Sequence, residues 1–454
     1  MDIRAELIRH VFFPIMERWK GNSIRRYLRE LQQTESLDRR ELHELRMRKL
    51  RGLLLHAVEH VPAYGHLKEL KPQIEEDPLR ALAQFPVLTK SEFQRHSDRY
   101  RADNAVDNQL IANRTGGSTG QPVAFYMDRY TVEHYEAARW RGLSWHNIHI
   151  GDSSLMIWGS PIELSRLNDV KFHAKELLLK NRKIVPAFQL QEHRADEYID
   201  LLNRFKPKYL YGYATSLHLF AGIVRKGKRP LRHKPAGIVS TAEVLRDEQR
   251  RELEQVFQCP VINEYGARDG GIIAYQCPKG GMHLSAENLW LEAVDPVTGR
   301  PVQPGQRGAL LVTDLNNFVM PRLRYQIGDI GVLSDDVCGC GRTLPLLSGI
   351  EGREDEVFLA KDGTLVHGQF ITHTIREMDG ILKYQAIQHD RETLTLKLVL
   401  QPDRIREPDI EELVRKLKIR LGDIRIQVEK VADIPPAASG KMRIHIREFP
   451  LRQN

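Results

Sequence analysis

The chain has 454 residues, of which 41% are hydrophobic and 7% aromatic, and its formal net charge at pH 7 is +8. This length and composition exclude a disordered polypeptide and predict more than one folded domain. Four cysteines are too few for a disulfide-rich secreted scaffold. The positive charge suits anionic partners such as nucleotides and coenzyme A, whereas no run of interleaved basic and aromatic residues indicates nucleic acid.

The N-terminal residues show no secretory signal. The apolar stretch 11–16 is short, contains Pro14 and is flanked by charged residues. No stretch approaches the roughly 18 apolar residues of a membrane-spanning helix. We therefore expect a cytoplasmic protein with no transmembrane segment.

Residues 1–75 are predicted to form a helical N-terminal segment. From Leu50 to Val61, apolar residues recur at i, i+3 and i+4, and the pattern ends at the helix breaker Pro62.

Residues 76–353 are predicted to form a large α/β domain. Short apolar runs typical of strands occur at 152–158, 207–213, 236–241 and 259–266. They alternate with amphipathic helical runs at 194–205 and 246–257. This alternation indicates mixed or parallel sheets with flanking helices. The runs at 289–295 and 308–315, separated by turn-forming residues, indicate a β-rich subdomain.

Residues 354–454 are predicted to form a small α+β domain. A hairpin is expected around Asp362 and Gly363, because an Asp-Gly pair favours a tight turn. Alternating apolar residues predict a strand at 393–400, followed by a helix at 408–421 and a strand at 424–431.

Four short segments carry candidate chemistry. In the segment 114–122, RTGGSTGQP, glycines and hydroxyl groups allow the backbone to wrap a phosphate, although no Walker A lysine follows. In the segment 263–271, Tyr265 suits stacking on a base and Asp269 suits a divalent metal. Asp329 suits ribose hydroxyls, and Lys441, on a loop of small residues, suits a phosphate. Each segment alone is also compatible with an ordinary turn or loop.

Together the segments resemble a known family. STG at 118–120, YG at 265–266 before Asp269, GD at 328–329, GR at 352–353 and SGK at 439–441 resemble the adenylate-forming superfamily of acyl-CoA synthetases and adenylation domains. The branch with phenylacetate–CoA ligases and capsular-polysaccharide-biosynthesis-type enzymes is the more similar one. The segments that carry this similarity are LLHAVEHVPAYGHL, FPVLTKSEF, YGYATSLHLFAG, STAEVL and CGCGR.

This resemblance implies a reaction. ATP and a carboxylic acid would give an acyl-adenylate and pyrophosphate, and the acyl group would pass to a thiol, with coenzyme A as the expected acceptor and Mg²⁺ as the metal. The alternative acceptors are an acyl-carrier protein, or an amine or hydroxyl group in polysaccharide or natural-product biosynthesis.

The resemblance also implies roles for individual residues. The nucleotide would be bound by Thr115, Gly116, Gly117, Ser118, Thr119, Gly120, Ala242, Glu243, Glu264, Tyr265, Gly266, Asp329 and Arg353. Lys441 and Asp269 would be catalytic, with Asp269 binding magnesium, and Asp355 would be the hinge between domains. The acyl pocket would contain Trp158, Tyr211, Gly212, Tyr213 and Ser216. The family usually has glutamate at the position of Asp269 and lysine at the position of Gln121.

The cysteines suggest a second metal. Cys277, His283, Cys338 and Cys340 make a Cys₃His set, the composition of a structural zinc site, and Gly339 and Gly341 would let the thiolates converge. The spacing is not that of a standard zinc finger, so reduced buried cysteines are the alternative. Cys259, beside a predicted strand, is expected in the core.

Overall fold

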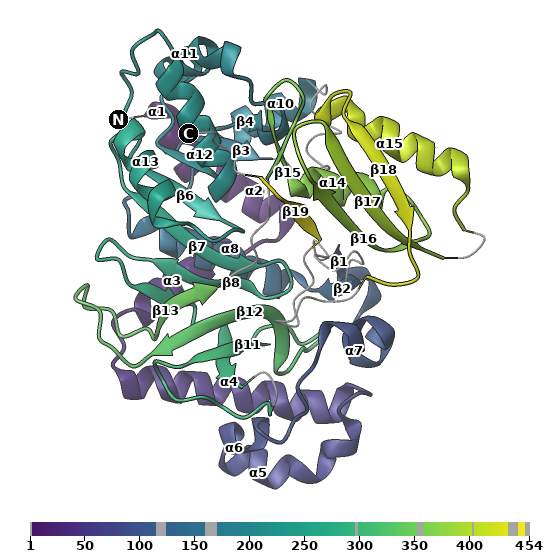
Figure 1. Ribbon diagram of the computed structural model, residues 1–454. Coiled ribbons are helices and arrows are strands. Elements are labelled where there is room, and N and C mark those ends of the chain that lie inside the picture. Colours follow the sequence, from purple (N-terminus) through teal and green to yellow (C-terminus); the bar gives the residue numbers. More distant parts are fainter. Residues whose placement is uncertain are drawn as a thin grey trace. The chain divides into compact units, whose positions relative to one another are not determined.

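The computed structural model describes residues 2–114, 124–158, 170–295, 298–351, 357–401, 404–434 and 444–449 (Figure 1). The chain divides into two compact units. Unit 1 comprises Met1–Thr115, Val123–Asp152 and Ile262–Arg353. Unit 2 comprises Gly116–Pro122, Ser153–Val261 and Glu354–Asn454.

Unit 1 begins with helices. They are α1 (Ile3–Leu7), η1 (Ile8–Phe12), α2 (Phe13–Lys20), α3 (Ile24–Thr34) and α4 (Arg39–His60). The long helix α4 starts at a capping box, in which Asp38 and Glu41 each accept a hydrogen bond from the other's backbone N–H group. Its predicted apolar face is fully buried. The helical pattern read from Leu50 to Val61 is therefore confirmed.

Short helices and one long helix connect α4 to the sheet of unit 1. The short ones are η2 (Gly65–Leu70), α5 (Lys71–Glu76), α6 (Pro78–Leu82), α7 (Lys90–Arg95), η3 (Ser97–Tyr100) and η4 (Asp107–Gln109). Strands β1 (Ile111–Arg114) and β2 (Ala124–Met127) pair in antiparallel fashion, and α8 (Arg129–Ser144) follows.

Among the described residues, seven strands of unit 1 pair side by side in one sheet. These are β7 (Val261–Ala267), β8 (Gly271–Gln276), β9 (Met282–Leu284), β10 (Leu289–Val294), β11 (Arg307–Asp314), β12 (Tyr325–Ser334) and β13 (Leu346–Glu351), in the order β10-β11-β12-β13-β9-β8-β7. Neighbouring strands are antiparallel. One buried apolar cluster joins this sheet to the buried face of α4, so the helix and the sheet share a core.

Unit 2 contains a parallel sheet. Strands β3 (Ser154–Trp158), β4 (Arg182–Pro186), β5 (Tyr209–Tyr213) and β6 (Gly237–Thr241) lie in the order β6-β5-β3-β4. The connecting helices are α10 (Val170–Lys180), η5 (Ala187–Gln189), η6 (Glu192–Arg194), α11 (Ala195–Phe205), α12 (Ala214–Lys226) and α13 (Asp247–Phe257). The apolar faces of α11, α12 and α13 bury one cluster with the strands, as the alternating sequence pattern predicts.

The C-terminal residues form a smaller sheet. The hairpin β14 (Val357–Leu359) and β15 (Leu365–His367) turns at Gly363, whose φ of 85° favours glycine. It is followed by α14 (Gly368–Arg376), β16 (Ile381–Gln388), β17 (Thr393–Leu400), α15 (Glu407–Leu421), β18 (Arg425–Lys430) and β19 (His445–Arg447). The sheet order is β18-β17-β16-β19, and α14 and α15 pack into its core.

The predicted fold class, mixed α/β with a β-rich part and a small C-terminal α+β sheet, is confirmed. Among the described residues, no helix combines the length and apolar character needed to span a bilayer. The domain boundaries proposed at residues 75 and 353 stay predictions.

Candidate active site

Two tyrosine–aspartate pairs link β7 and the loop after it to β12 in unit 1. The Tyr265 hydroxyl, on β7, donates to the Asp329 carboxylate at 2.8 Å, although the residues are 64 positions apart. The Tyr325 hydroxyl, on β12, donates to Asp269 Oδ2 at 2.8 Å. Tyr325 and Asp329 both lie on β12, four residues apart, and the pairing of β12 with β11 is irregular between them. Hydrogen bonds between β12 and the segment formed by β7 and its following loop therefore involve three predicted site residues, namely Tyr265, Asp269 and Asp329.

The two pairs differ in exposure. Tyr265 and Asp329 are half-buried, which leaves surface for a ligand, whereas Asp269 and Tyr325 are buried. The register of β7 against β8 shifts between Tyr265 and Gly266, and a side chain at Gly266 would meet the Gly271 carbonyl at 2.8 Å. Glycine is therefore required where the strand turns out of its ladder.

Glu264 has a different environment from its neighbour Tyr265. It is 2% exposed and forms an ion pair with Arg139 of α8 at 3.4 Å. A buried carboxylate needs such a partner. The described contacts of Glu264 are therefore those of a residue that anchors β7 to α8, and its assignment to the nucleotide stays a prediction.

Unit 2 gathers the predicted acyl-pocket aromatics at the carboxyl ends of parallel strands. Trp158 ends β3 and Tyr213 ends β5, and their rings stack with centroids 4.3 Å apart. Tyr211 lies 5.8 Å from Trp158, and Ser216 is buried in the first turn of α12. A side chain at Gly212 would approach the Ile157 carbonyl to 2.5 Å, so β3 and β5 pack closely only because this residue is glycine. Ligands of open parallel sheets bind at such carboxyl ends.

Ala242 and Glu243 directly follow β6, the last of the four parallel strands in chain order. Ala242 adopts a left-handed conformation with φ 66°, which costs an L-residue roughly 1–2 kcal/mol. Glu243 Oε2 accepts hydrogen bonds from the backbone N–H group of Thr215 at 2.8 Å and from its hydroxyl at 2.6 Å. It thereby satisfies an amide in the first turn of α12. The left-handed turn at Ala242 and the hydrogen bonds between Glu243 and Thr215 together hold the end of β6 beside the start of α12.

The remaining predicted residues fall outside the described residues. They are the phosphate-loop residues Thr115, Gly116, Gly117, Ser118, Thr119 and Gly120, together with Arg353, Asp355 and Lys441.

Arg322 was not recognised from the sequence. Its side chain is buried, and Nη2 donates to the Asp269 carbonyl at 2.9 Å. Its guanidinium lies 4.6 Å from the ring centroid of Phe125 on β2. Nε and Nη1 of Arg322 have no hydrogen-bond partner among the described residues. The alternation of charged and apolar residues in PRLRYQ was the only signal available.

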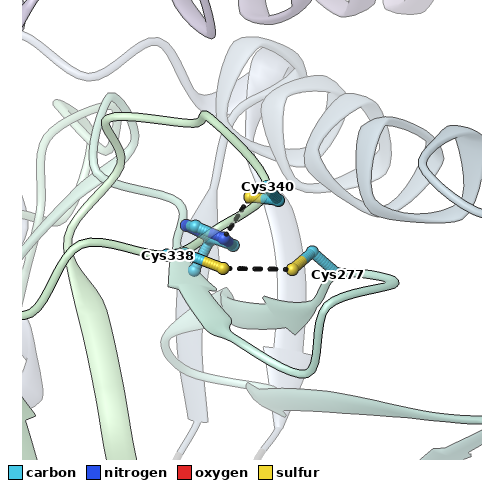
Figure 2. Close-up of side chains that lie close together, drawn as sticks. Cys277, Cys338 and Cys340 are labelled. Atoms are coloured by element: carbon cyan, nitrogen blue, oxygen red, sulfur yellow. Dashed lines mark hydrogen bonds between the residues drawn. The ribbon is translucent and has the colours of Figure 1, made fainter.

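The predicted Cys₃His set converges in unit 1. Cys277 follows β8, His283 lies on β9, and Cys338 and Cys340 lie between β12 and β13. The ligand atoms of all four lie within 4.8 Å of one another. Cys277 Sγ is 3.6 Å from Cys338 Sγ, and Cys340 Sγ is 3.2 Å from His283 Nε2 (Figure 2). Burial raises the pKa of the Cys277 thiol to about 11. Burial also acts on Cys340, but hydrogen bonds from Arg342 outweigh it and lower the pKa of that thiol.

Comparison with known proteins identifies a matching family model and several similar proteins. The family model described as the CapK C-terminal domain matches residues 358–448. Protein CapK of Staphylococcus aureus is 26% identical over 369 residues, which cover 81% of this chain and 80% of that protein. The phenylacetate-coenzyme A ligase of Thermus thermophilus is 23% identical over 439 residues, which cover 90% of this chain and 97% of that protein.

Comparison with solved structures also finds coenzyme A ligases. A 2-hydroxyisobutyryl-CoA ligase in the postadenylation state, in complex with R3-HIB-AMP, superposes with a TM-score of 0.58 at 19% identity over 91% of each chain. The same ligase with 2-HIB-AMP and CoA in the thioesterification state gives a TM-score of 0.58 at 20% identity, covering 91% of this chain and 92% of that one.

The fold is that of the adenylate-forming ligases. In sequence, the chain is a homologue of Protein CapK and of the phenylacetate-coenzyme A ligases. The family resemblance read from the sequence is therefore confirmed.

Proposed function

We propose that this protein activates a carboxylic acid with ATP, releasing pyrophosphate, and transfers the acyl group from the acyl-adenylate to coenzyme A. The hydrogen bond between Tyr265 and Asp329 carries the proposal, because it joins the two side chains assigned to adenine and ribose. The phenylacetate-coenzyme A ligase of Thermus thermophilus and the 2-hydroxyisobutyryl-CoA ligase both carry coenzyme A in their names, which supports coenzyme A as the acceptor here.

In the first half-reaction, a carboxylate oxygen forms a bond to the α-phosphorus of ATP and the bond to pyrophosphate breaks. Two anions must meet, so the site must position them and offset their charge. Tyr265 is proposed to stack on adenine while Asp329 accepts hydrogen bonds from the ribose hydroxyls. Thr115 to Gly120 are proposed to bind the phosphates, and Lys441 to approach both the carboxylate and the α-phosphate.

Asp269 fits the proposed magnesium site by its chemistry. A carboxylate oxygen is the ligand that Mg²⁺ prefers, and Tyr325 holds Oδ2 of this carboxylate in one orientation. When bound, Mg²⁺ would offset the charge of the phosphates. The family resemblance implies glutamate at this position. Aspartate is one methylene group shorter, so its carboxylate depends more on Tyr325 for its orientation.

The acid is proposed to bind at the carboxyl ends of β3 and β5. The stacked rings of Trp158 and Tyr213 form a flat apolar wall, which suits an aryl or other planar acid. In the second half-reaction, the thiolate sulfur of coenzyme A attacks the acyl carbon and AMP leaves. We propose that residues 354–454 reorient at Asp355 between the two steps, which removes Lys441 and admits the thiol.

The reaction is tested by ATP–pyrophosphate exchange with a panel of carboxylic acids. We expect exchange that depends on one class of acid, and CoA-thioester formation with the same acid when coenzyme A is added. Exchange without CoA-thioester would favour an acyl-carrier protein or an amine or hydroxyl acceptor. No exchange with any acid in a broad panel would contradict the proposed function.

The two tyrosine–aspartate pairs predict different kinetic defects. Tyr265→Phe keeps the stacking ring but removes the donor to Asp329, which should raise the KM for ATP by roughly 5- to 30-fold, or about 1–2 kcal/mol. Tyr325→Phe removes the donor to Asp269, which should raise the Mg²⁺ concentration for half-maximal exchange about tenfold or more. Both parameters are measured for both variants.

Each variant is the matched control for the other, because both lose one hydroxyl group that donates to a carboxylate. Saturating Mg²⁺ should restore the rate of Tyr325→Phe but not the KM of Tyr265→Phe. Identical changes in both parameters for both variants would argue against the separate roles of Asp329 and Asp269.

A further inference from the structure

We propose that Cys277, His283, Cys338 and Cys340 bind a Zn²⁺ ion that fixes the turn between α3 and α4 to the body of unit 1. This inference stands apart from the proposed reaction, since it uses none of the residues assigned to ATP, the acid or coenzyme A.

The ligand atoms lie close enough together to surround one tetrahedral ion, with Cys340 Sγ and His283 Nε2 3.2 Å apart. Zinc–sulfur bonds of about 2.3 Å and zinc–nitrogen bonds of about 2.0–2.1 Å place neighbouring ligand atoms roughly 3.6–3.8 Å apart. The Cys277 and Cys338 sulfurs are 3.6 Å apart, and all four ligand atoms lie within 4.8 Å of one another. Four protein ligands complete the coordination shell, which is typical of a structural site.

The surroundings prepare the ligands for a metal. His283 Nδ1 lies 3.1 Å from the Leu344 carbonyl, so Nδ1 carries the proton and donates it there. Nε2, the nitrogen that faces Cys340, then keeps a free lone pair for the ion. Such a hydrogen bond to the second ring nitrogen accompanies almost all metal-binding histidines.

A glycine leaves the space that the ligands occupy. A Cβ atom at Gly281 would lie 2.8 Å from Cys338 Sγ and 3.3 Å from His283 Nε2. The turn from Cys277 to Gly281 closes through hydrogen bonds from the Cys277 N–H to the Gly281 carbonyl and from the Gly280 N–H to the Cys277 carbonyl, both 2.9 Å. The backbone therefore brings ligands from β8, β9 and the loop after β12 around one point.

The loop that carries two of the ligands also receives the N-terminal helices. Just after Cys340, Arg342 Nε donates to Glu35 at 3.1 Å and the Thr343 hydroxyl donates to the Leu37 carbonyl at 2.7 Å. Glu35 and Leu37 lie in the short turn between α3 and α4. Trp145 completes the contact, because its indole N–H donates to Glu35 at 2.7 Å and its ring lies 4.4 Å from the Arg342 guanidinium.

A bound ion would therefore act on the turn through this loop. Between the end of β12 at Ser334 and the start of β13 at Leu346, the loop has no regular secondary structure. Two metal bonds at Cys338 and Cys340 would restrict its conformations and hold Arg342 and Thr343 in place for the turn.

The metal content of the purified full-length protein tests the proposal. Elemental analysis and native mass spectrometry should give about one zinc per chain for the wild type. Cys340→Ser should lose most of this zinc. Cys259→Ser is the matched control, because Cys259 is also a buried free cysteine but lies in the core of unit 2, and it should keep the zinc.

A second measurement separates metal binding from misfolding. Zinc released from the wild type by a mercurial reagent should be counted with a chromophoric chelator, and limited proteolysis should then cut the turn at residues 35–38 at least several-fold faster. Three results would overturn the proposal. They are a wild type with no zinc above background, a Cys277–Cys338 disulfide found in the native protein by mass spectrometry, or an equal loss of zinc from the Cys259→Ser control. Release of zinc without faster cleavage would overturn its proposed action on the turn.

Discussion

Replacing Lys441 with alanine should slow formation of the acyl-adenylate by roughly 100-fold or more, the size of effect seen when one key charge stabiliser is removed from a transition state. The carboxylate and the α-phosphate are both negative, and a lysine ammonium placed between them lowers the energy of their approach. ATP–pyrophosphate exchange measures this half-reaction directly.

The second half-reaction supplies the control for this prediction. When preformed acyl-adenylate and coenzyme A are provided, Lys441→Ala should form the thioester at nearly the wild-type rate, because the lysine is proposed to leave the site before the thiol enters. Lys418→Ala, which removes another lysine of the C-terminal domain, paired with Asp423 on the surface, should leave both half-reactions unchanged. Equal slowing of the two half-reactions by Lys441→Ala would show that the lysine is not specific to adenylation.

Much of the fold follows from local patterns. The burial of Leu50, Leu53 and Leu54 on α4 and the parallel strands of unit 2 reflect apolar periodicities that are visible in the chain itself. The order β10-β11-β12-β13-β9-β8-β7 was not predictable in this way, because strand neighbours depend on contacts between distant residues. Helix α8 was also missed, because its buried face contains Glu133, His134 and Arg141, which read as polar.

Part of the candidate site could likewise be predicted from the sequence, and part could not. Family resemblance named Tyr265, Asp269 and Asp329, but nothing in the sequence indicated that tyrosine hydroxyls from opposite segments would hold both aspartates. The convergence of the cysteines was predicted from composition, since thiols and an imidazole beside glycines suit one ion. Their actual proximity depends on the pairing of His283 with Leu346 across β9 and β13, which only the fold reveals.

A buried ion pair in unit 1 predicts the largest effect on stability. Arg141 on α8 and Glu287 before β10 are each 1% exposed and hydrogen-bonded to one another. The Thr34 hydroxyl of α3 also donates to Glu287, and Lys49 donates to its carbonyl at 2.8 Å. Glu287→Gln would remove the nearest counter-charge of the buried Arg141 and leave only Glu35, whose carboxylate is 3.9 Å from Arg141 Nε. Breaking a buried ion pair in this way costs about 3–5 kcal/mol, and we expect the free energy of unfolding to fall by roughly the lower end of that range.

Urea unfolding followed by tryptophan fluorescence measures this loss, with Glu30→Gln as the matched control. Glu30 lies on α3 and pairs with Arg26 at 2.8 Å, but both side chains are exposed, so its replacement should cost less than about 1 kcal/mol. A drop of less than 1 kcal/mol for Glu287→Gln at pH 7 would mean that the pair contributes no more than an exposed one.

The loss of stability in Glu287→Gln should also depend on pH. Burial alone would raise the pKa of Glu287, but the charge of Arg141 and the hydrogen bonds from Arg141 and Thr34 outweigh it and lower the pKa in the folded state. A carboxyl group with a lowered folded pKa stabilises the protein fully above its unfolded pKa, about 4.3, and loses that contribution as the pH falls through the folded value. The difference in unfolding free energy between wild type and Glu287→Gln should therefore be largest near neutral pH and shrink below about pH 4.3. A difference that grows as the pH falls would show that the carboxylate is not held ionised by Arg141.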